Sequence, residues 1–227
     1  MEAERIGREF NMSDTSLLDT IHESGVIAVL VFDEAENAVP LARALLEGHV
    51  NMMELTLRTP AAMDALKEIK ANVPEMIVGI GTILNPDQVQ EVHEAGAVFG
   101  VAPGLNPNVV QAAQKVGLPF YPGVATPSDI EKAVELGCSI LKFFPAEPSG
   151  GLGYLKSMAG PYAHLDLKYI PLGGVNASNI SNYLESPLVL GVGGSWIATR
   201  QLIHNQDWKT ITQNALEATQ IIKEMRG

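Results

Sequence analysis

The sequence has little cysteine and no long hydrophobic run. Its single cysteine, Cys138, excludes an internal disulfide framework and a metal site built from cysteines, and we interpret it as a small core residue. No apolar run approaches the roughly 18 residues that a membrane-spanning helix needs. Residues 1–16 are charged and lack the apolar segment of a secretory signal, so we expect a cytoplasmic protein with residues 1–12 as a flexible arm.

Basic residues are also scarce. The 227 residues include 15 Lys and Arg against 26 Asp and Glu, which gives a formal net charge of −11 at pH 7. This balance argues against nucleic acid and anionic membrane as partners, and any anionic ligand must be attracted locally. The five histidines are scattered and none has a partner at metal-ligand spacing, so we expect neither a metal nor a cofactor.

Short apolar, β-branched runs alternate with helical patterns along the chain. The expected strands are residues 26–32, 51–57, 77–82, 97–102, 119–124, 139–144, 168–172 and 188–192. The expected helices are residues 35–47, 60–71, 85–94, 107–115, 127–136, 152–159, 177–184 and 207–225. This alternation predicts an α/β fold, a single (β/α)8 TIM barrel over residues 13–227 with an additional N-terminal helix. A doubly wound open sheet would need an edge or a switch region, and the sequence shows neither.

Proline and glycine mark the ends of the expected helices. Four helices are expected to begin with a capping residue followed by proline, at Thr59-Pro60, Asn85-Pro86, Asn106-Pro107 and Thr126-Pro127. Four glycines that follow helical runs are expected to end them in the left-handed conformation: Gly48, Gly96, Gly117 and Gly137.

Lys142 interrupts the apolar run Ser139-Ile-Leu-Lys-Phe-Phe-Pro145. Burying an unpaired ammonium costs several kcal/mol or drives off its proton. A deprotonated amine in a dry pocket is a nucleophile that forms a Schiff base with a carbonyl carbon. The alternative is a structural lysine that reaches the strand end or pairs with a carboxylate.

The strand at residues 51–57 carries polar side chains on one face. Side chains alternate along a strand, so Glu54, Thr56 and Arg58 share the face opposite Met53 and Leu55. In a barrel that polar face is the lumen, where Glu54 can meet Lys142 as a general acid and base. Arg58, nearer the C-terminal mouth, suits the bidentate binding of a carboxylate. The alternative is an edge strand with its polar face in solvent.

Two glycine-rich turns follow the last two expected strands. They are Leu172-Gly-Gly-Val-Asn176 and Gly191-Val-Gly-Gly-Ser195, and a helical pattern begins after each. In this fold the loops after the last two strands are the usual phosphate site. Neither turn matches the dinucleotide or ATP-binding glycine motifs, so we expect neither ligand.

The motifs MELTLRT, VGIGTILNPDQ, VAPGLNP, PFYPGVATPS, LKFFPAE, PLGGVNASN and GVGGSW together resemble those of the family of 2-keto-3-deoxy-6-phosphogluconate (KDPG) aldolase and 4-hydroxy-2-oxoglutarate (KHG) aldolase. The resemblance implies that Lys142 is the Schiff-base lysine and Glu54 the proton shuttle, and that Arg58 and Thr82 hold the pyruvate carboxylate. It assigns the pocket wall and the phosphate-binding turns by matching position to Pro103, Phe144, Gly173, Gly174, Gly194 and Ser195.

The resemblance further implies a metal-independent class I aldolase that forms a homotrimer. Its substrate would be KDPG, cleaved to pyruvate and glyceraldehyde 3-phosphate, with 4-hydroxy-2-oxoglutarate as a second anionic keto acid. Leu172 stands where the family usually has threonine, which leaves the aldehyde partner open. The alternatives are an aldolase for the galactonate epimer, a phosphosugar isomerase or epimerase on the same barrel, and a protein that only binds an acidic metabolite.

Overall fold

The computed structural model describes residues 14–226, and its apolar, β-branched runs form parallel strands. The strands are β1 (Val26–Leu30), β2 (Met52–Thr56), β3 (Ile77–Gly81), β4 (Gly100–Val101), β5 (Phe120–Tyr121), β6 (Gly123–Val124), β7 (Ile140–Phe143), β8 (Lys168–Pro171) and β9 (Val192–Gly194). The α-helices are α1 (Asp14–Ser24), α2 (Ala38–Glu47), α3 (Ala61–Asn72), α4 (Pro86–Glu94), α5 (Pro107–Val116), α6 (Pro127–Glu135), α7 (Gly151–Ala159), α8 (Ile180–Leu184), α9 (Arg200–His204) and α10 (Trp208–Arg226). Two 3-10 helices, η1 (Ala35–Asn37) and η2 (Gly160–Leu165), complete the described elements.

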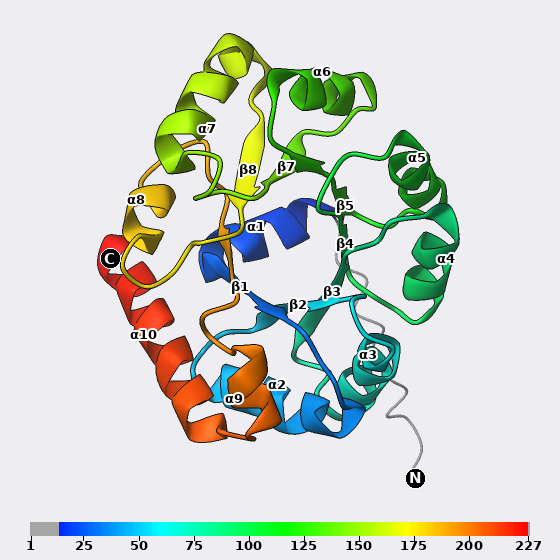
Figure 1. Ribbon diagram of the computed structural model, residues 1–227, viewed down its shortest axis with the longest axis vertical. Coiled ribbons are helices and arrows are strands. Elements are labelled where there is room, and N and C mark those ends of the chain that lie inside the picture. Colours follow the sequence, from blue (N-terminus) through cyan, green and yellow to red (C-terminus); the bar gives the residue numbers. More distant parts are fainter. Residues whose placement is uncertain (1–13, 227) are drawn as a thin grey trace, which may run out of the picture.

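The strands form a ring that the helices surround (Figure 1). Hydrogen bonds define a six-stranded sheet in the order β5-β4-β3-β2-β1-β9 and a three-stranded sheet in the order β6-β7-β8. β5 and β6 are two pieces of one barrel strand, interrupted at Pro122, which has no N–H to donate. At the other junction, bridges Tyr169–Val189 and Leu172–Gly193 connect β8 to the segment that ends in β9. The predicted α/β barrel is therefore confirmed, with β5 and β6 as its fifth strand.

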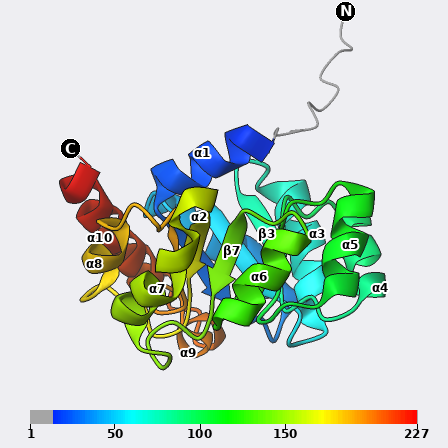
Figure 2. The ribbon, with the colours of Figure 1, turned by 90° about the horizontal axis from the view of Figure 1, so that it is seen from above.

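The barrel has two apolar layers. Outward-facing residues such as Met53 and Leu55 of β2 belong to the core between the strands and the surrounding helices. A second cluster fills the lumen: Leu17, Ile21, Ile27, Met52, Phe99, Val101, Tyr121, Ile170 and Leu172. Leu17 and Ile21 come from α1, which lies across one end of the barrel, while α9 lies at the opposite end (Figure 2). The predicted additional N-terminal helix thus closes the N-terminal end and leaves the C-terminal end for a site.

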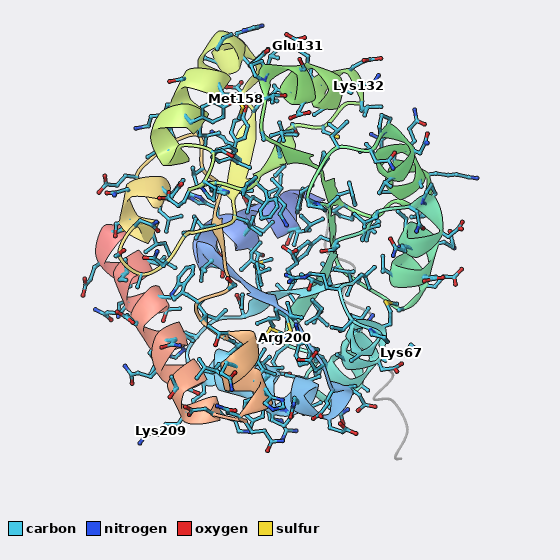
Figure 3. All side chains as sticks on the ribbon, viewed as in Figure 1. Lys67, Glu131, Lys132, Met158, Arg200 and Lys209 are labelled. Carbon is cyan, nitrogen blue, oxygen red and sulfur yellow. The ribbon has the colours of Figure 1, made fainter. Side chains whose placement is uncertain are left out.

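Charged helix residues lie on the outside of the ring, as Lys67, Lys132 and Lys209 show (Figure 3). None of the helices among residues 14–226 is long and apolar enough to cross a membrane. In the same part of the chain, no three His, Cys, Asp or Glu side chains are grouped so that they could hold a metal ion. The predicted flexible arm, residues 1–12, lies outside the described residues.

Three of the four predicted helix starts are capped by a side chain. Asn85 and Thr126 each form a capping box, and Asn106 accepts a hydrogen bond from the backbone of Asn108. The cap predicted at Thr59 is wrong, since α3 begins at Ala61 without a side-chain cap. The hydroxyl of Thr59 instead donates to the carbonyl of Phe32, which ties the turn after β2 to the segment after β1.

Gly48 does not end its helix in the left-handed conformation. Gly96, Gly117 and Gly137 have positive φ as predicted, but Gly48 has a φ of −84° and the next residue, His49, has a φ of 63°. Gly48 serves a different purpose, because a Cβ there would lie 2.3 Å from Cβ of Ala215 on α10. The glycine is needed for close packing of α2 against α10.

The last strand and helices also differ from the prediction. The strand expected at residues 188–192 is β9, which spans Val192–Gly194, because two of the predicted turn glycines extend the ladder beside β1. The helix expected at residues 177–184 begins only at Ile180, and α9 was not predicted. Both helices are single short turns, which carry almost no periodic signal.

Gly48→Ala tests the packing of α2 on α10. We expect the new methyl group to force the helices apart and to lower the free energy of unfolding by about 2 kcal/mol, the usual cost of overpacking. Gly153→Ala is the matched control, because a Cβ at Gly153 in α7 would have no atom within 4 Å. Urea unfolding followed by circular dichroism measures both, and equal stability of the two variants would contradict the packing role.

Candidate active site

Lys142 and Glu54 form an ion pair inside the barrel. Nζ of Lys142 on β7 lies 3.3 Å from Oε1 of Glu54 on β2, and the two residues are only 5% and 2% exposed. Both side chains leave their strands on the lumen side, as the alternation predicted, because Leu141, Phe143 and Leu55 face the outer core. Removing two charges from water offsets much of their attraction, so such a pair is weak evidence of a stabilising role. A pair kept at this cost is a candidate for chemistry.

Glycine makes room for the carboxylate of Glu54. A Cβ at Gly81, the last residue of β3, would lie 1.8 Å from Oε1 of Glu54. Gly79 on the same strand likewise makes room for the ring of Phe99, which a Cβ would meet at 2.2 Å. Gly81 is thus a site residue that was not predicted; the available signal was two glycines in one short strand, since glycine in a strand often marks a close approach.

Phe144 lies beside the lysine. The Nζ of Lys142 is 5.3 Å from the centre of the Phe144 ring, within the range of a cation–π contact. The same ring lies against the turn after β8, where a Cβ at Gly173 would be 3.2 Å from it. Phe144 therefore connects the amine to the glycine turn, consistent with the predicted pocket wall.

The space around the pair is almost filled. A cavity of about 10 Å³, the size of one water molecule, is enclosed by Ile27, Glu54, Val101, Tyr121, Lys142, Ile170, Leu172 and Gly193. Leu172, which stands where the family that the sequence resembles usually has threonine, lines this cavity. Its side chain fills the space where a Cβ at Gly193 would lie. A larger cavity, about 360 Å³, lies at the N-terminal ends of β5 and β7, away from the pair. Because the lumen below the pair is filled and α1 closes it, a ligand reaches Lys142 from the C-terminal mouth.

Arg58, Thr82 and Pro103 lie on the turns at this mouth. β2 ends at Thr56, so Arg58 is exposed on the following turn and not on the lumen face where the alternation placed it. Among the described residues its guanidinium has no hydrogen-bond or ion-pair partner, so it is available to an anion. Pro103 follows β4. A Cβ at Gly123 would lie only 2.2 Å from the carbonyl oxygen of Pro103, so the two backbones are packed closely.

Thr82 has a strained backbone. It directly follows β3 with a φ of 63°, a conformation that β-branched residues rarely adopt and that costs about 1–3 kcal/mol. Its hydroxyl forms no hydrogen bond with any residue of the described part of the chain. Such strain is concentrated at functional sites, which supports a binding role for this hydroxyl.

The glycine turn after β8 exposes unpaired N–H groups. Gly173 and Gly174 have φ values of 93° and 89°, which only glycine adopts readily. Within residues 14–226, their N–H groups and that of Ser195 have no hydrogen-bond acceptor. Free N–H groups at neighbouring turns suit an anion. Gly194, the last residue of β9, also makes room for the ring of Trp196, which a Cβ would meet at 1.9 Å.

One ion pair at the mouth was not predicted. Nε of Arg200, the first residue of α9, lies 2.7 Å from Oδ2 of Asp33, which follows β1. The hydrogen bond from Arg200 holds the pKa of the Asp33 carboxyl below its usual value. The pair connects the turns after β1 and β9, and no sequence motif marks it because 167 positions separate the two residues.

Comparison with known proteins places the chain in one family. The family model of KDPG and KHG aldolase matches residues 17–214. The KHG/KDPG aldolase of Escherichia coli (strain K12) is 40% identical over 213 residues, 94% of this chain and 98% of that protein. The 2-dehydro-3-deoxy-phosphogluconate aldolase of Pseudoalteromonas atlantica is 39% identical over 200 residues, 88% of this chain and 92% of that protein.

A solved structure shares the fold. The KDPG aldolase of Legionella pneumophila, with pyruvate captured at low pH as a covalent carbinolamine intermediate, superimposes with a TM-score of 0.83 and is 38% identical. The match covers 88% of this chain and 96% of that one.

The coupling of Lys142 and Glu54 can be measured by a double-mutant cycle. Glu54→Leu or Lys142→Met alone leaves one buried charge unpaired, and we expect each to lower the free energy of unfolding by about 3–5 kcal/mol. The double variant buries no charge, so most of that loss should be recovered. Urea unfolding at neutral pH measures all four proteins. A double variant whose loss equals the sum of the two single losses would show that the pair is not coupled.

Proposed function

Because the chain belongs to the KDPG and KHG aldolase family, we propose that it is a class I aldolase whose Schiff-base lysine is Lys142. The reaction is the cleavage of 2-keto-3-deoxy-6-phosphogluconate to pyruvate and glyceraldehyde 3-phosphate. The observation that carries the assignment of the lysine is the burial of its amine beside the Glu54 carboxylate. An amine and a proton acceptor in contact are the minimum that carbinolamine chemistry needs.

Glu54 moves the protons of the first half-reaction. When the 2-keto acid enters, the Glu54 carboxylate takes a proton from the Lys142 ammonium, and the free amine attacks the C2 ketone. The resulting carbinolamine loses water after Glu54 returns the proton to its hydroxyl, which leaves an iminium. Gly81 lets the carboxylate reach this position.

The iminium is the electron sink for bond cleavage. Glu54 removes the proton of the C4 hydroxyl, the C3–C4 bond breaks, and its electron pair moves into the iminium to form an enamine of pyruvate. The C4 fragment leaves as the aldehyde. Protonation of the enamine at C3 and hydrolysis of the imine release pyruvate and restore the amine of Lys142.

The binding roles follow the ring of turns at the mouth. Arg58 and Thr82 hold the substrate carboxylate, a role supported by the free guanidinium and the unpaired hydroxyl. Pro103 and Phe144 form the pocket wall. Gly173, Gly174, Gly194 and Ser195 bind the phosphate, and the free N–H groups of Gly173, Gly174 and Ser195 support this role. The homotrimer and the cytoplasmic location remain predictions, and sedimentation analysis of the purified protein tests the former.

Borohydride reduction in the presence of pyruvate tests the Schiff base. We expect a mass increment for the reduced adduct on the peptide that contains Lys142, and none in Lys142→Met. Lys168→Met is the control, because Lys168 also lies on a barrel strand but its amine donates to the carbonyl of Pro187. Absence of an adduct from the wild-type protein would favour enolisation chemistry, as in an isomerase or epimerase. An adduct on another lysine would reassign the nucleophile.

Steady-state kinetics on three substrates tests the specificity. We expect kcat/KM to be highest for KDPG, and lower for 4-hydroxy-2-oxoglutarate because it has no phosphate for the two turns to bind. The galactonate epimer serves as the third substrate, since it differs only in the configuration at C4, one of the two carbons of the cleaved bond. A higher kcat/KM for the unphosphorylated acid would contradict the phosphate role of the turns, and a preference for the epimer would change the substrate but keep the mechanism.

A further inference from the structure

Outside the catalytic pair, a second hydrogen-bonded pair lies behind the glycine turn. The hydroxyl of Tyr183 on α8 donates to Oε1 of Glu147, which follows β7. Tyr183 is 1% exposed, and burial, together with this bond, raises the pKa of its hydroxyl well above the usual value. The hydroxyl is therefore a permanent donor, and 36 positions of chain separate the two partners.

Glu147 is bonded through its backbone to the glycine turn. The hydrogen bonds between β7 and β8 continue beyond both strands: the N–H of Leu172 donates to Phe143 at 2.9 Å, and the N–H of Ala146 donates to Leu172 at 2.7 Å. The last of the series runs from the N–H of Glu147 to the carbonyl of Gly173, also at 2.9 Å. The position of Glu147 thus sets the orientation of the Gly173 peptide.

The side chain of Glu147 lies against the second glycine. A Cβ at Gly174 would be 2.5 Å from Cβ of Glu147 and 2.7 Å from its Cγ. On its other side, the carbonyl of Gly174 accepts hydrogen bonds from the side-chain amides of Asn176 at 3.1 Å and Asn179 at 3.2 Å. The turn is held between these groups, which leaves the N–H groups of the two glycines free.

The carboxylate end of Glu147 is held between two helices. A Cβ at Gly151, the first residue of α7, would be 3.0 Å from Oε1 of Glu147 and 3.4 Å from the hydroxyl of Tyr183. A helix N-terminus favours a negative charge. Without the Tyr183 hydroxyl, the Glu147 carboxylate would lose the bond that holds it in this position. A mobile negative charge would then lie beside the Gly173–Gly174 turn, which has to bind an anion.

We propose that Glu147 and Tyr183 are positioning residues that hold the Gly173–Gly174 turn in the shape that binds the substrate phosphate. This inference rests on the proposed function, and it assigns to the pair no contact with the reacting atoms. Loss of the bond should weaken binding of the phosphorylated end alone and leave the chemistry at Lys142 unchanged.

Tyr183→Phe tests the inference because it removes only the hydroxyl. We expect KM for KDPG to rise on the order of fivefold to tenfold with kcat nearly unchanged, since the lost hydrogen bond had a charged acceptor and supported binding. Exchange of the C3 protons of pyruvate for deuterium, followed by NMR, is the second readout. It requires Lys142 and Glu54 but no phosphate site, so its rate should stay within about twofold of wild type.

Two further variants keep the test decisive. Glu147→Gln retains the backbone bond and weakens the acceptor, so it should shift KM in the same direction, and it substitutes if Tyr183→Phe fails to fold. Tyr162→Phe is the matched control, because it removes a similar tyrosine–glutamate bond, to Glu131 at 3.0 Å, away from the turn. We expect this control to behave as wild type in both assays.

The outcomes separate the inference from the proposed function. Equal losses in KDPG cleavage and in pyruvate exchange, or an unchanged KM in both pair variants, would overturn the positioning role while the aldolase stands. A wild-type protein that neither exchanges the protons of pyruvate nor cleaves KDPG would instead overturn the proposed function itself.

Discussion

The ion pair between Lys142 and Glu54 is the constraint on which the site depends. Two charged side chains in an apolar lumen require space, contacts that stabilise their charges, and access for a ligand from one end of the barrel. The neighbouring residues provide all three. Gly81 leaves space for the carboxylate, and the ring of Phe144 lies beside the ammonium. Apolar residues fill the barrel below the pair, with α1 across its end. The reactive groups therefore meet a ligand only from the C-terminal mouth.

Parallel strands explain how one ligand can reach residues from so many parts of the chain. Every strand of the ring ends at the same mouth, so each turn adds a group within a short distance of the amine. The exposed guanidinium of Arg58 and the strained Thr82 follow β2 and β3, while the free N–H groups follow β8 and β9. A 2-keto acid with a phosphate tail has an anionic group at each end, and this arrangement offers donors on both sides of the lysine.

The alternation of side chains along a strand made the Lys142–Glu54 pair predictable from the sequence. Alternation placed Glu54 and Lys142 in the lumen, and the glycine pairs after the last two expected strands indicated the two turns. Alternation failed at Arg58 because β2 ends two residues earlier, at Thr56. The sequence does not distinguish a glycine that ends a helix from one that permits close packing, so the role predicted for Gly48 is wrong. The bond between Glu147 and Tyr183 had no local signal at all, because folding alone brings those residues together.

A crystal structure of the protein incubated with pyruvate would show directly whether Lys142 forms a covalent bond with the keto acid. We expect electron density continuous from Nζ of Lys142 to C2 of pyruvate, with the Glu54 carboxylate within hydrogen-bond distance of the new centre and the pyruvate carboxylate near Arg58 and Thr82. Pyruvate bound without a covalent bond beside an intact Lys142–Glu54 pair, or attached to a different lysine, would contradict this expectation.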